Sequence, residues 1–405
     1  MAPALLWAVC AALIVTRSFD QVLYFRVNVI MTDYQWYFAS VVYPISYLCA
    51  IIPVVAAQAL RGRLTPATRA FPVRSMAIMA VLDTASNLMS SWPQVALGGT
   101  AANVLSTLAL PANMALAGLA LGTRFKWTHY VGAGLAVAAG VAQVLPALVS
   151  GDAGGGATAT GFTYAAWAAV MALSAVPTAA ANVYKEGVLK ADRNLGVDVW
   201  YVNAGESVFQ LALAAVTAPL VAVPFIPGSI PFSDLPAYLR RAHACAVGTG
   251  GVCSGDVMPP AAWMTVYIGF NLAFSALMLV LFRAGSSTLF AVASTARVPV
   301  VAAMLLLPLL AGPSASAPGW GDAVAATLAV GGLALYQWQP ELPPVGRGVA
   351  LVSDRASADA PPSGLPSGAA VHACVATAGD GAEAAADVTT RLLEPPDRPA
   401  TPPRL

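Results

Sequence analysis

The stretch STLALPA (residues 106–112) has a partner in STARVPV (residues 294–300), 188 positions later and inside another apolar run. At the same offset Asp83 corresponds to Asn271, and the spacing from each of these residues to the proline of its stretch is identical. Apolar runs often match by chance, but an ungapped register of polar residues and proline is less common. We therefore predict that the chain contains an internal repeat.

The composition of the 405-residue chain is that of a membrane protein. Hydrophobic residues make up 58% of it and charged residues only 10%, whereas soluble proteins carry about 25% charged residues. A soluble chain of this length would need polar helix faces that are mostly missing here. The net charge of +1 and the scattered lysines and arginines do not favour a nucleic-acid partner. We predict an all-α polytopic membrane protein that is embedded in the lipid bilayer.

Ten apolar runs are each long enough for a membrane-spanning helix, which takes about 20 residues. The first run is the weakest, because Arg17 and Asp20 interrupt it. In chain order the runs are residues 3–27, 36–60, 75–97, 100–121, 127–149, 162–184, 199–225, 261–282, 287–311 and 321–338.

A glycine-rich segment, GDAGGGATATG, divides these runs five and five. We predict a first five-helix repeat over residues 1–150, a flexible linker over 151–161 and a second repeat over 162–340. Because each half has an odd number of helices, the two repeats must have opposite orientations in the membrane. Inverted repeats are typical of secondary transporters, with the solute site near the midplane. Residues 341–405, rich in Pro, Ala, Gly and Ser, are predicted to be a disordered tail.

The distribution of basic residues predicts the orientation. With the N-terminus inside, the loops on that side carry ten lysines and arginines, whereas the opposite loops carry three, Arg26, Arg240 and Arg241. The positive-inside rule then places both termini on the cytosol-like face.

Several motifs together resemble a known family: QVLYF in the first run, LPANM followed by TRFKWTHYVGAGLAV, then VNAGESVFQLAL, ASTARVPV and LALYQWQP. In their order and spacing they are similar to the chloroquine-resistance-transporter-like (CRT-like) family of the drug/metabolite transporter superfamily. The resemblance implies ten helices and movement of small organic solutes across an organelle membrane. It is greatest to the plant branch, which moves glutathione and γ-glutamylcysteine. The parasite branch exports peptides and cationic drugs with protons.

The loop over residues 226–260 lies on the side opposite the termini, and its sequence FSDLPAYLRRAHACAV has helical periodicity. Cys245 and Cys253 flank the glycine-rich AVGTGGV, which is flexible enough to let them meet, and the family also has a cysteine pair in this loop. We predict a disulfide, which requires an oxidising compartment; two free thiols are the alternative. No metal site is expected, because only His243 is nearby.

Polar residues inside apolar runs are costly in a membrane and are therefore candidates for the solute site. Asp83, with Asn87 one turn later, stands where the family has an acidic residue, and a proton-coupled carrier needs such a carboxylate. A permanent pair with an arginine is the alternative. Glu206 and Gln210 are also one turn apart, and Glu206 departs from the family, where a small or neutral residue is expected.

The basic residues inside the runs each have two interpretations. Arg17 and Asp20 are spaced to neutralise each other, although Asp20 also matches a polar cavity position of the family. Lys185 is expected to snorkel to the surface. Arg297, two residues before Pro299, either holds a carboxylate of the solute or pairs with an acidic residue and holds helices together.

The remaining candidates share helices with these charges, and either line the cavity or pack helices together. Ser106 and Ser294 are hydroxyl donors on the repeated stretches. The other expected solute contacts are Asn103, Thr107, Asn113, Asn271 and Thr295.

We therefore expect a transporter of glutathione, γ-glutamylcysteine or related thiols and peptides, with proton coupling as an option. The alternatives are a nucleotide-sugar or phosphorylated-metabolite carrier, and a carrier of amino acids and amphipathic cations.

An enzyme is not expected, because the three histidines are scattered and form no catalytic set. We expect no cofactor, a monomer or homodimer, and a plastid envelope or vacuolar membrane. The first run begins almost at Met1, so no targeting peptide is expected before it.

Overall fold

In the computed structural model of the protein, the regular elements of the described part are all helices. Residues 151–156 of the expected linker and the whole expected tail, 341–405, lie outside that part. The structure describes residues 3–149, 157–191, 197–224, 226, 229–249, 253, 256, 258–315 and 320–339.

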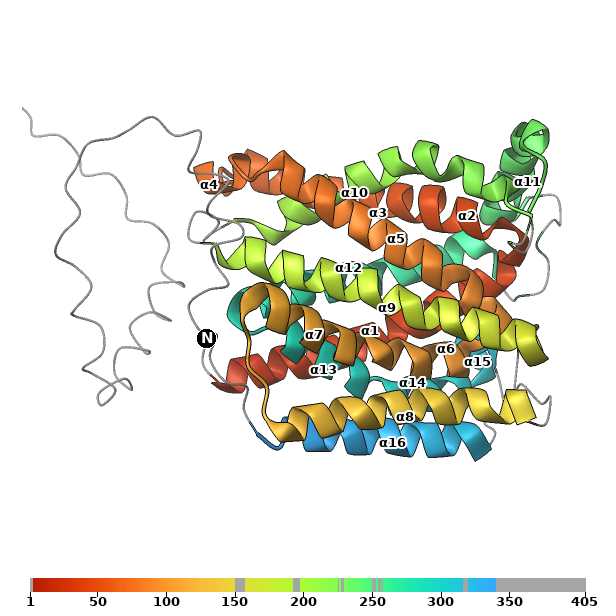
Figure 1. The fold of residues 1–405 in the computed structure, drawn as a ribbon. Helices are drawn as coiled ribbons and strands as arrows, with labels where there is room; N and C mark the ends of the chain where they lie inside the picture. Colours follow the sequence, from red (N-terminus) through yellow and green to blue (C-terminus); the bar gives the residue numbers. More distant parts are fainter. Residues whose placement is uncertain are drawn as a thin grey trace, which may run out of the picture. The chain divides into compact units, whose positions relative to one another are not determined.

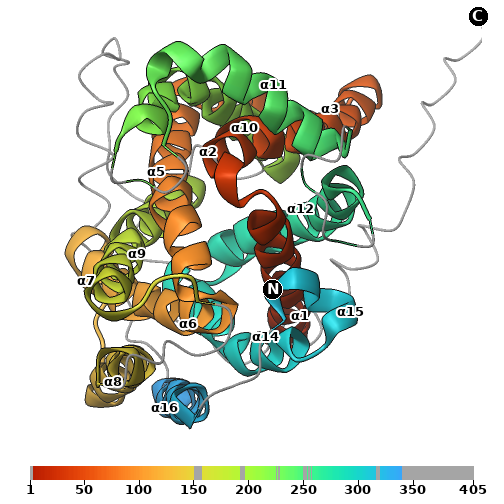
Figure 2. The same ribbon diagram turned by 90° about the vertical axis from the view of Figure 1, so that its right-hand side faces the viewer.

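The long helices lie side by side along one direction (Figure 1), and the view along them in Figure 2 shows a bundle. They follow the apolar runs, because a helix satisfies every backbone polar group within its own segment; the runs over residues 100–121 and 287–311 are each divided into shorter helices. They are α1 (Pro3–Ile30), α3 (Tyr43–Leu60), α5 (Val73–Leu97), α6 (Gly99–Leu105), α7 (Ala109–Leu121), α8 (Trp127–Val149), α9 (Gly161–Lys190), α10 (Val199–Thr217), α12 (Pro260–Ala284), α13 (Ser287–Ala296), α14 (Val298–Leu305) and α16 (Trp320–Gln337).

Shorter elements connect these helices or cross their ends. They are η1 (Thr32–Tyr34), α2 (Gln35–Tyr37), η2 (Phe38–Val42), α4 (Pro66–Arg69), η3 (Ser106–Leu108), η5 (Ala218–Ala222), η6 (Phe232–Asp234), α11 (Leu235–Val247), α15 (Pro308–Ala311) and η7 (Gly312–Ser314). The π-helical turn η2 leads directly into α3, so that residues 32–60 form one span.

Eight helical segments of the described chain are long and apolar enough to cross a membrane, and the protein is a polytopic α-helical membrane protein. The segments are Ala8–Ile30, Thr32–Leu60, Gly99–Leu121, Trp127–Pro146, Gly161–Lys190, Val199–Ala222, Pro260–Ala284 and Ser287–Leu305.

The two other expected spans, α5 and α16, are not among these eight. Helix α5 carries a polar face that includes Asp83, Asn87 and Gln94, which lowers its apolar character. The apolar part of α16, Trp320–Tyr336, is shorter than a typical span. Both helices nevertheless lie alongside the others in the bundle (Figure 1), and ten spans remain a prediction.

Two segments are interrupted at the repeated stretches STLALPA (residues 106–112) and STARVPV (residues 294–300). Helix α6 gives way to the 3₁₀ turn η3 before α7 begins. Helix α13 ends at Ala296, and Arg297 separates it from α14, whose second residue is Pro299. A proline there has no backbone N–H to donate to the preceding turn. The two broken segments pack against each other, and Asn103 donates from its amide to the carbonyl oxygen of Val298 at 3.1 Å.

Helices α8 and α16 form a close pair at one edge of the bundle (Figures 1 and 2). A Cβ atom on Gly132 would lie 2.6 Å from the carbonyl oxygen of Gly332, so the two backbones approach each other through small residues.

We expect Gly132→Val to destabilise the protein by about 1–3 kcal/mol, because the backbone of α16 would have to move away. Gly134→Val on the same helix is the matched control, since nothing lies within 4 Å of a Cβ atom at Gly134. Thermal unfolding of the purified protein in detergent measures both. Equal midpoints for the two variants would contradict this packing.

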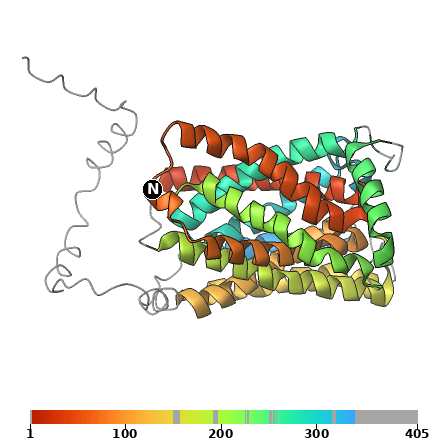
Figure 3. The same cartoon turned by 90° about the horizontal axis from the view of Figure 1, so that it is seen from above.

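The loop between α10 and α12 crosses one end of the bundle. Its helix α11 lies across the ends of the long helices (Figure 3). Cys245, in α11, forms a disulfide with Cys253, as predicted. Because Cys245 is fully buried, the bond fastens the loop to the packed side of α11.

Arg26 joins this loop to the rest of the bundle. It is not a loop residue, as the orientation argument assumed, but a buried residue of α1. Its guanidinium donates two hydrogen bonds to the carboxylate of Asp256 and lies 3.6 Å from the ring centre of Trp263. It also donates to the carbonyl oxygens of Leu309 at 2.6 Å and Leu310 at 3.0 Å. Four segments therefore meet at one cation.

Candidate functional site

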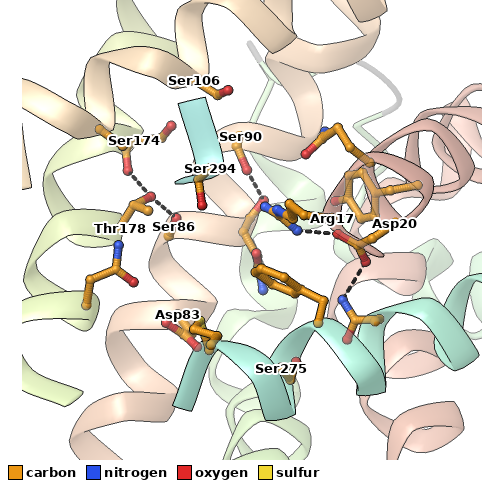
Figure 4. A pocket seen from close by; sticks show the side chains of 18 of the residues that line it. Arg17, Asp20, Asp83, Ser86, Ser90, Ser106, Ser174, Thr178, Ser275 and Ser294 are labelled. Carbon is orange, nitrogen blue, oxygen red and sulfur yellow. Dashed lines mark hydrogen bonds and ion pairs between the residues drawn. The ribbon is translucent and has the colours of Figure 1, made fainter. Parts of the chain in front are cut away.

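A cavity of about 220 Å³ lies at the centre of the bundle. Polar side chains converge on it from helices of both halves of the chain, as Figure 4 shows. Many large hydrophobic side chains, such as Leu119 and Val216, are exposed, whereas polar groups line the cavity, which is the reverse of the pattern in a soluble protein. Its charged lining residues are Arg17, Asp20, Asp83, Lys185 and Arg297.

Arg17 and Asp20 form an ion pair on α1 at one side of the cavity (Figure 4). Asp20 also accepts a hydrogen bond of 2.7 Å from the amide of Asn271 on α12, whose oxygen accepts from the hydroxyl of Tyr43 at 3.0 Å. The guanidinium of Arg17 lies 4.4 Å from the ring centre of Phe274. The charge of Asp20 is thus neutralised within the protein, as the spacing of Arg17 and Asp20 predicted.

Asp83, Lys185 and Glu206 bring together helices α5, α9 and α10. The Nζ atom of Lys185 donates to Asp83 at 2.6 Å and lies 2.9 Å from a carboxylate oxygen of Glu206. The side chains of Lys185 and Glu206 are 2% and 5% exposed, whereas that of Asp83 is 27% exposed and lines the cavity. One ammonium therefore links a cavity-facing carboxylate to a second carboxylate buried behind it.

Arg297 lies at the break between α13 and α14 and is 4% exposed. Its guanidinium donates to the hydroxyl of Ser106 at 2.9 Å, to the carbonyl oxygen of Ser294 at 3.0 Å and to the side-chain oxygen of Gln21 at 3.3 Å. Within the described chain no carboxylate forms an ion pair with it, and its Nε atom is buried without a hydrogen-bond partner. The expected alternative, a structural pair with Asp83, Glu206 or Asp20, is not formed.

Hydroxyl groups line the wall between these charges. Ser86 on α5 and Thr178 on α9 are hydrogen-bonded to each other, and Thr178 also donates to the carbonyl oxygen of Ser174 at 2.8 Å (Figure 4). Ser294 points into the cavity, and its hydroxyl has no partner among the described residues. The wall therefore offers donors and acceptors without a further fixed charge.

The structure brings most of the expected solute contacts to the cavity and leaves some outside. Those that line it are Asp20, Asp83, Asn87, Gln210, Asn271, Thr295 and Arg297. Asn103, Thr107 and Asn113 are instead buried between helices, at 0–2% exposure, and are not among the lining residues. Glu206 also does not line the cavity and reaches it only through Lys185.

Lys185 corrects the sequence interpretation. A lysine near the end of a helix was expected to snorkel to the surface, but this one is buried and paired with two carboxylates. The hydroxyl and amide lining was also missed. The sequence does contain a pattern that predicts this lining. Polar residues recur every four positions over residues 86–94 and 174–182, which places them on one face of each helix. The lining residues in question are Gln21, Tyr24, Tyr43, Ser86, Ser90, Gln94, Ser174, Thr178, Asn182, Tyr267 and Ser275.

The described residues contain no group of three or more His, Cys, Asp or Glu side chains placed to hold a metal ion. The charged, hydroxyl and amide side chains that line the cavity can bind a solute by ion pairing and hydrogen bonding.

A family model described as CRT-like, chloroquine-resistance transporter-like, matches residues 5–336. A chloroquine resistance transporter of Toxoplasma gondii is 29% identical over 306 residues, which are 71% of this chain and 33% of that protein. Protein CLT1, chloroplastic, of Arabidopsis thaliana is 29% identical over 277 residues, 66% of this chain and 57% of that protein. Protein CLT3, chloroplastic, of the same plant is 26% identical over 337 residues, 80% of this chain and 71% of that protein. The chain thus spans a third of the first relative and more than half of the second.

Proposed function

Because the chain belongs to the CRT-like, chloroquine-resistance transporter-like family, we propose that it carries small organic solutes across a membrane through the central cavity. The observation that carries the proposal is the cavity itself, where five charged side chains meet inside an apolar bundle. Ionisable groups are rare inside membranes and mark solute pathways there. The Toxoplasma gondii relative is named as a transporter, which agrees with the expectation that the chain is not an enzyme.

We further propose that ten helices span the membrane as two inverted five-helix repeats. The repeat equates α1 with α9, α3 with α10, α5 with α12, and the broken segment α6–α7 with α13–α14. Under that correspondence the packing is symmetric: α5 packs on α9 as α12 does on α1, α7 on α9 as α14 on α1, and α10 on α5 as α3 on α12. A carrier built this way exposes its central site to each side in turn.

Thiol peptides of the glutathione and γ-glutamylcysteine type are the proposed solutes, as the resemblance to the plant branch implies. They carry carboxylates and an ammonium, and the cavity offers Arg297 for the former and Asp83 for the latter. A phosphorylated solute would need several basic side chains without acidic partners, and of the three that line the cavity two are paired with carboxylates.

Uptake of labelled glutathione and γ-glutamylcysteine into proteoliposomes, with and without a pH gradient, tests the substrate. We expect saturable uptake that the gradient increases. Absence of uptake by protein that is folded, as judged by its thermal transition, would remove thiol peptides as solutes. Nucleotide sugars, amino acids and amphipathic cations would then be offered to the same vesicles.

The proposed location is an organelle membrane, with both termini on the cytosol-like face and the chain acting as a monomer or homodimer. Two relatives from Arabidopsis thaliana are named chloroplastic, which supports the plastid envelope. The disulfide of the α11 loop supports a compartment on the opposite side that tolerates oxidation.

A further inference from the structure

We infer that the cavity recognises a zwitterion in a fixed orientation, with the ammonium of the solute at Asp83 and its carboxylate at Arg297. The inference rests on the proposed transport function and names the class of solute for the same site. It depends on where the charges of the cavity balance and where they do not.

Among the described residues, the charges around the cavity cancel overall but not at each end. Arg17 and Asp20 neutralise each other on α1. Asp83 and Glu206 share the single cation of Lys185, which leaves one negative charge in excess when both carboxylates are ionised. An excess charge in a buried site is costly unless a counter-charge reaches it. A cationic group of the solute, arriving at the cavity-facing carboxylate of Asp83, supplies that counter-charge.

The opposite end has the complementary excess. Arg297 is buried, has no carboxylate partner in the described chain, and keeps its Nε atom without an acceptor. The hydroxyl of Ser294, which points into the cavity, also lacks a partner there. Guanidinium and hydroxyl together form a donor set suited to a carboxylate. Figure 4 shows Ser106, which accepts from Arg297, on the other side of the cavity from Asp83.

Glu206 has a specific part in this arrangement, although it does not touch the cavity. When the ammonium of a solute takes Asp83, Lys185 must give up its 2.6 Å hydrogen bond to that carboxylate. While the solute occupies Asp83, the 2.9 Å contact between Lys185 and Glu206 keeps the ammonium of Lys185 paired. Glu206 is therefore a positioning residue, which makes Asp83 available to the solute without leaving a buried ammonium unpaired.

Three probes of nearly equal size separate the possibilities: alanyl-alanine, its N-acetyl derivative, which is an anion, and its C-terminal amide, which is a cation. Uptake into proteoliposomes is measured as the ratio of maximal rate to KM. We expect the zwitterion to be preferred over each derivative by at least about ten-fold, the effect of one charge-assisted hydrogen bond. Equal uptake of all three, preference for a derivative, or uptake of none by folded protein would overturn the inference.

Variants then assign the two ends. Arg297→Gln should lose the discrimination against the amide alone, and Asp83→Asn the discrimination against the N-acetyl derivative alone. Glu206→Gln should behave as Asp83→Asn does, through a raised KM for the zwitterion and an unchanged KM for the N-acetyl derivative. A structural defect would change all three probes in parallel, and that result, or unchanged selectivity, would overturn the assignment.

The controls are Arg124→Gln and Asp234→Asn, which remove one charge of each sign at exposed positions away from the cavity. The outcomes also separate this inference from the choice of thiol peptides. Uptake of alanyl-alanine without uptake of glutathione would refute only the thiol substrate. Uptake of glutathione together with its N-acetyl and amide derivatives at equal efficiency would refute only the zwitterion inference.

Discussion

Arg26→Met is expected to lower the free energy of unfolding by about 3–5 kcal/mol, the usual cost of removing one partner from a buried ion pair. The variant removes two hydrogen bonds and the positive charge from the carboxylate of Asp256, and it takes a donor from the carbonyl oxygens of Leu309 and Leu310. Methionine also loses the stacking on Trp263. The thermal midpoint of the purified protein in detergent should fall by many degrees.

The double variant Arg26→Met with Asp256→Asn separates the ion pair from packing. An amide in place of the Asp256 carboxylate removes the buried negative charge that has lost the guanidinium, so part of the lost stability should return. Gly312→Ala is also expected to destabilise the protein, because Gly312 has a φ of +54° and a Cβ atom there would lie 2.6 Å from the Nε atom of Arg26. Wild-type stability for Arg26→Met would show that the four segments are held together without this cation.

The helices themselves are largely predictable, because span length and proline are local signals. The run expected over residues 127–149 is α8 with the same bounds, and the interruption near Pro299 follows from the missing backbone donor. Helix α5 shows where local hydropathy fails. Its polar face is buried toward the cavity rather than exposed to lipid, and no window along the chain distinguishes these two environments.

The site is predictable only in part, for a related reason. Asp83, Asn271 and Arg297 stand out because polar groups are costly inside apolar runs. Lys185 gives the same signal whether it snorkels or is buried, and its partner Asp83 lies 102 positions away in the sequence. The sequence is equally consistent with Asn103 lining the cavity and with Asn103 joining two helices. In the structure it joins two helices, because α6 packs against α14 and the Asn103 amide donates to the carbonyl oxygen of Val298. Contacts between residues far apart in the sequence therefore determine which of these polar side chains line the cavity and which join helices.

Because Lys185 pairs with carboxylates from two other helices, its loss is expected to reduce the stability of the protein more than any other single substitution considered. Lys185→Met leaves Asp83 and Glu206 next to each other with no cation between them. Two ionised carboxylates at such a distance repel strongly in a low-dielectric interior, and the loss of a buried partner adds about 3–5 kcal/mol. We expect little folded protein at neutral pH and no uptake of any solute, measured by the yield of monodisperse protein and by proteoliposome assay.

A second change should restore the fold if repulsion is the cause. Lys185→Met with Glu206→Gln leaves Asp83 as the only carboxylate of the group, and that side chain is 27% exposed toward the cavity. Its charge can then be solvated, so stability should recover to near the wild-type midpoint. Lys185→Met with Asp83→Asn should recover less, because the remaining carboxylate, Glu206, is only 5% exposed. Equal recovery of the two double variants would contradict the unequal burial of the carboxylates, and no recovery in either would assign Lys185 a packing role instead.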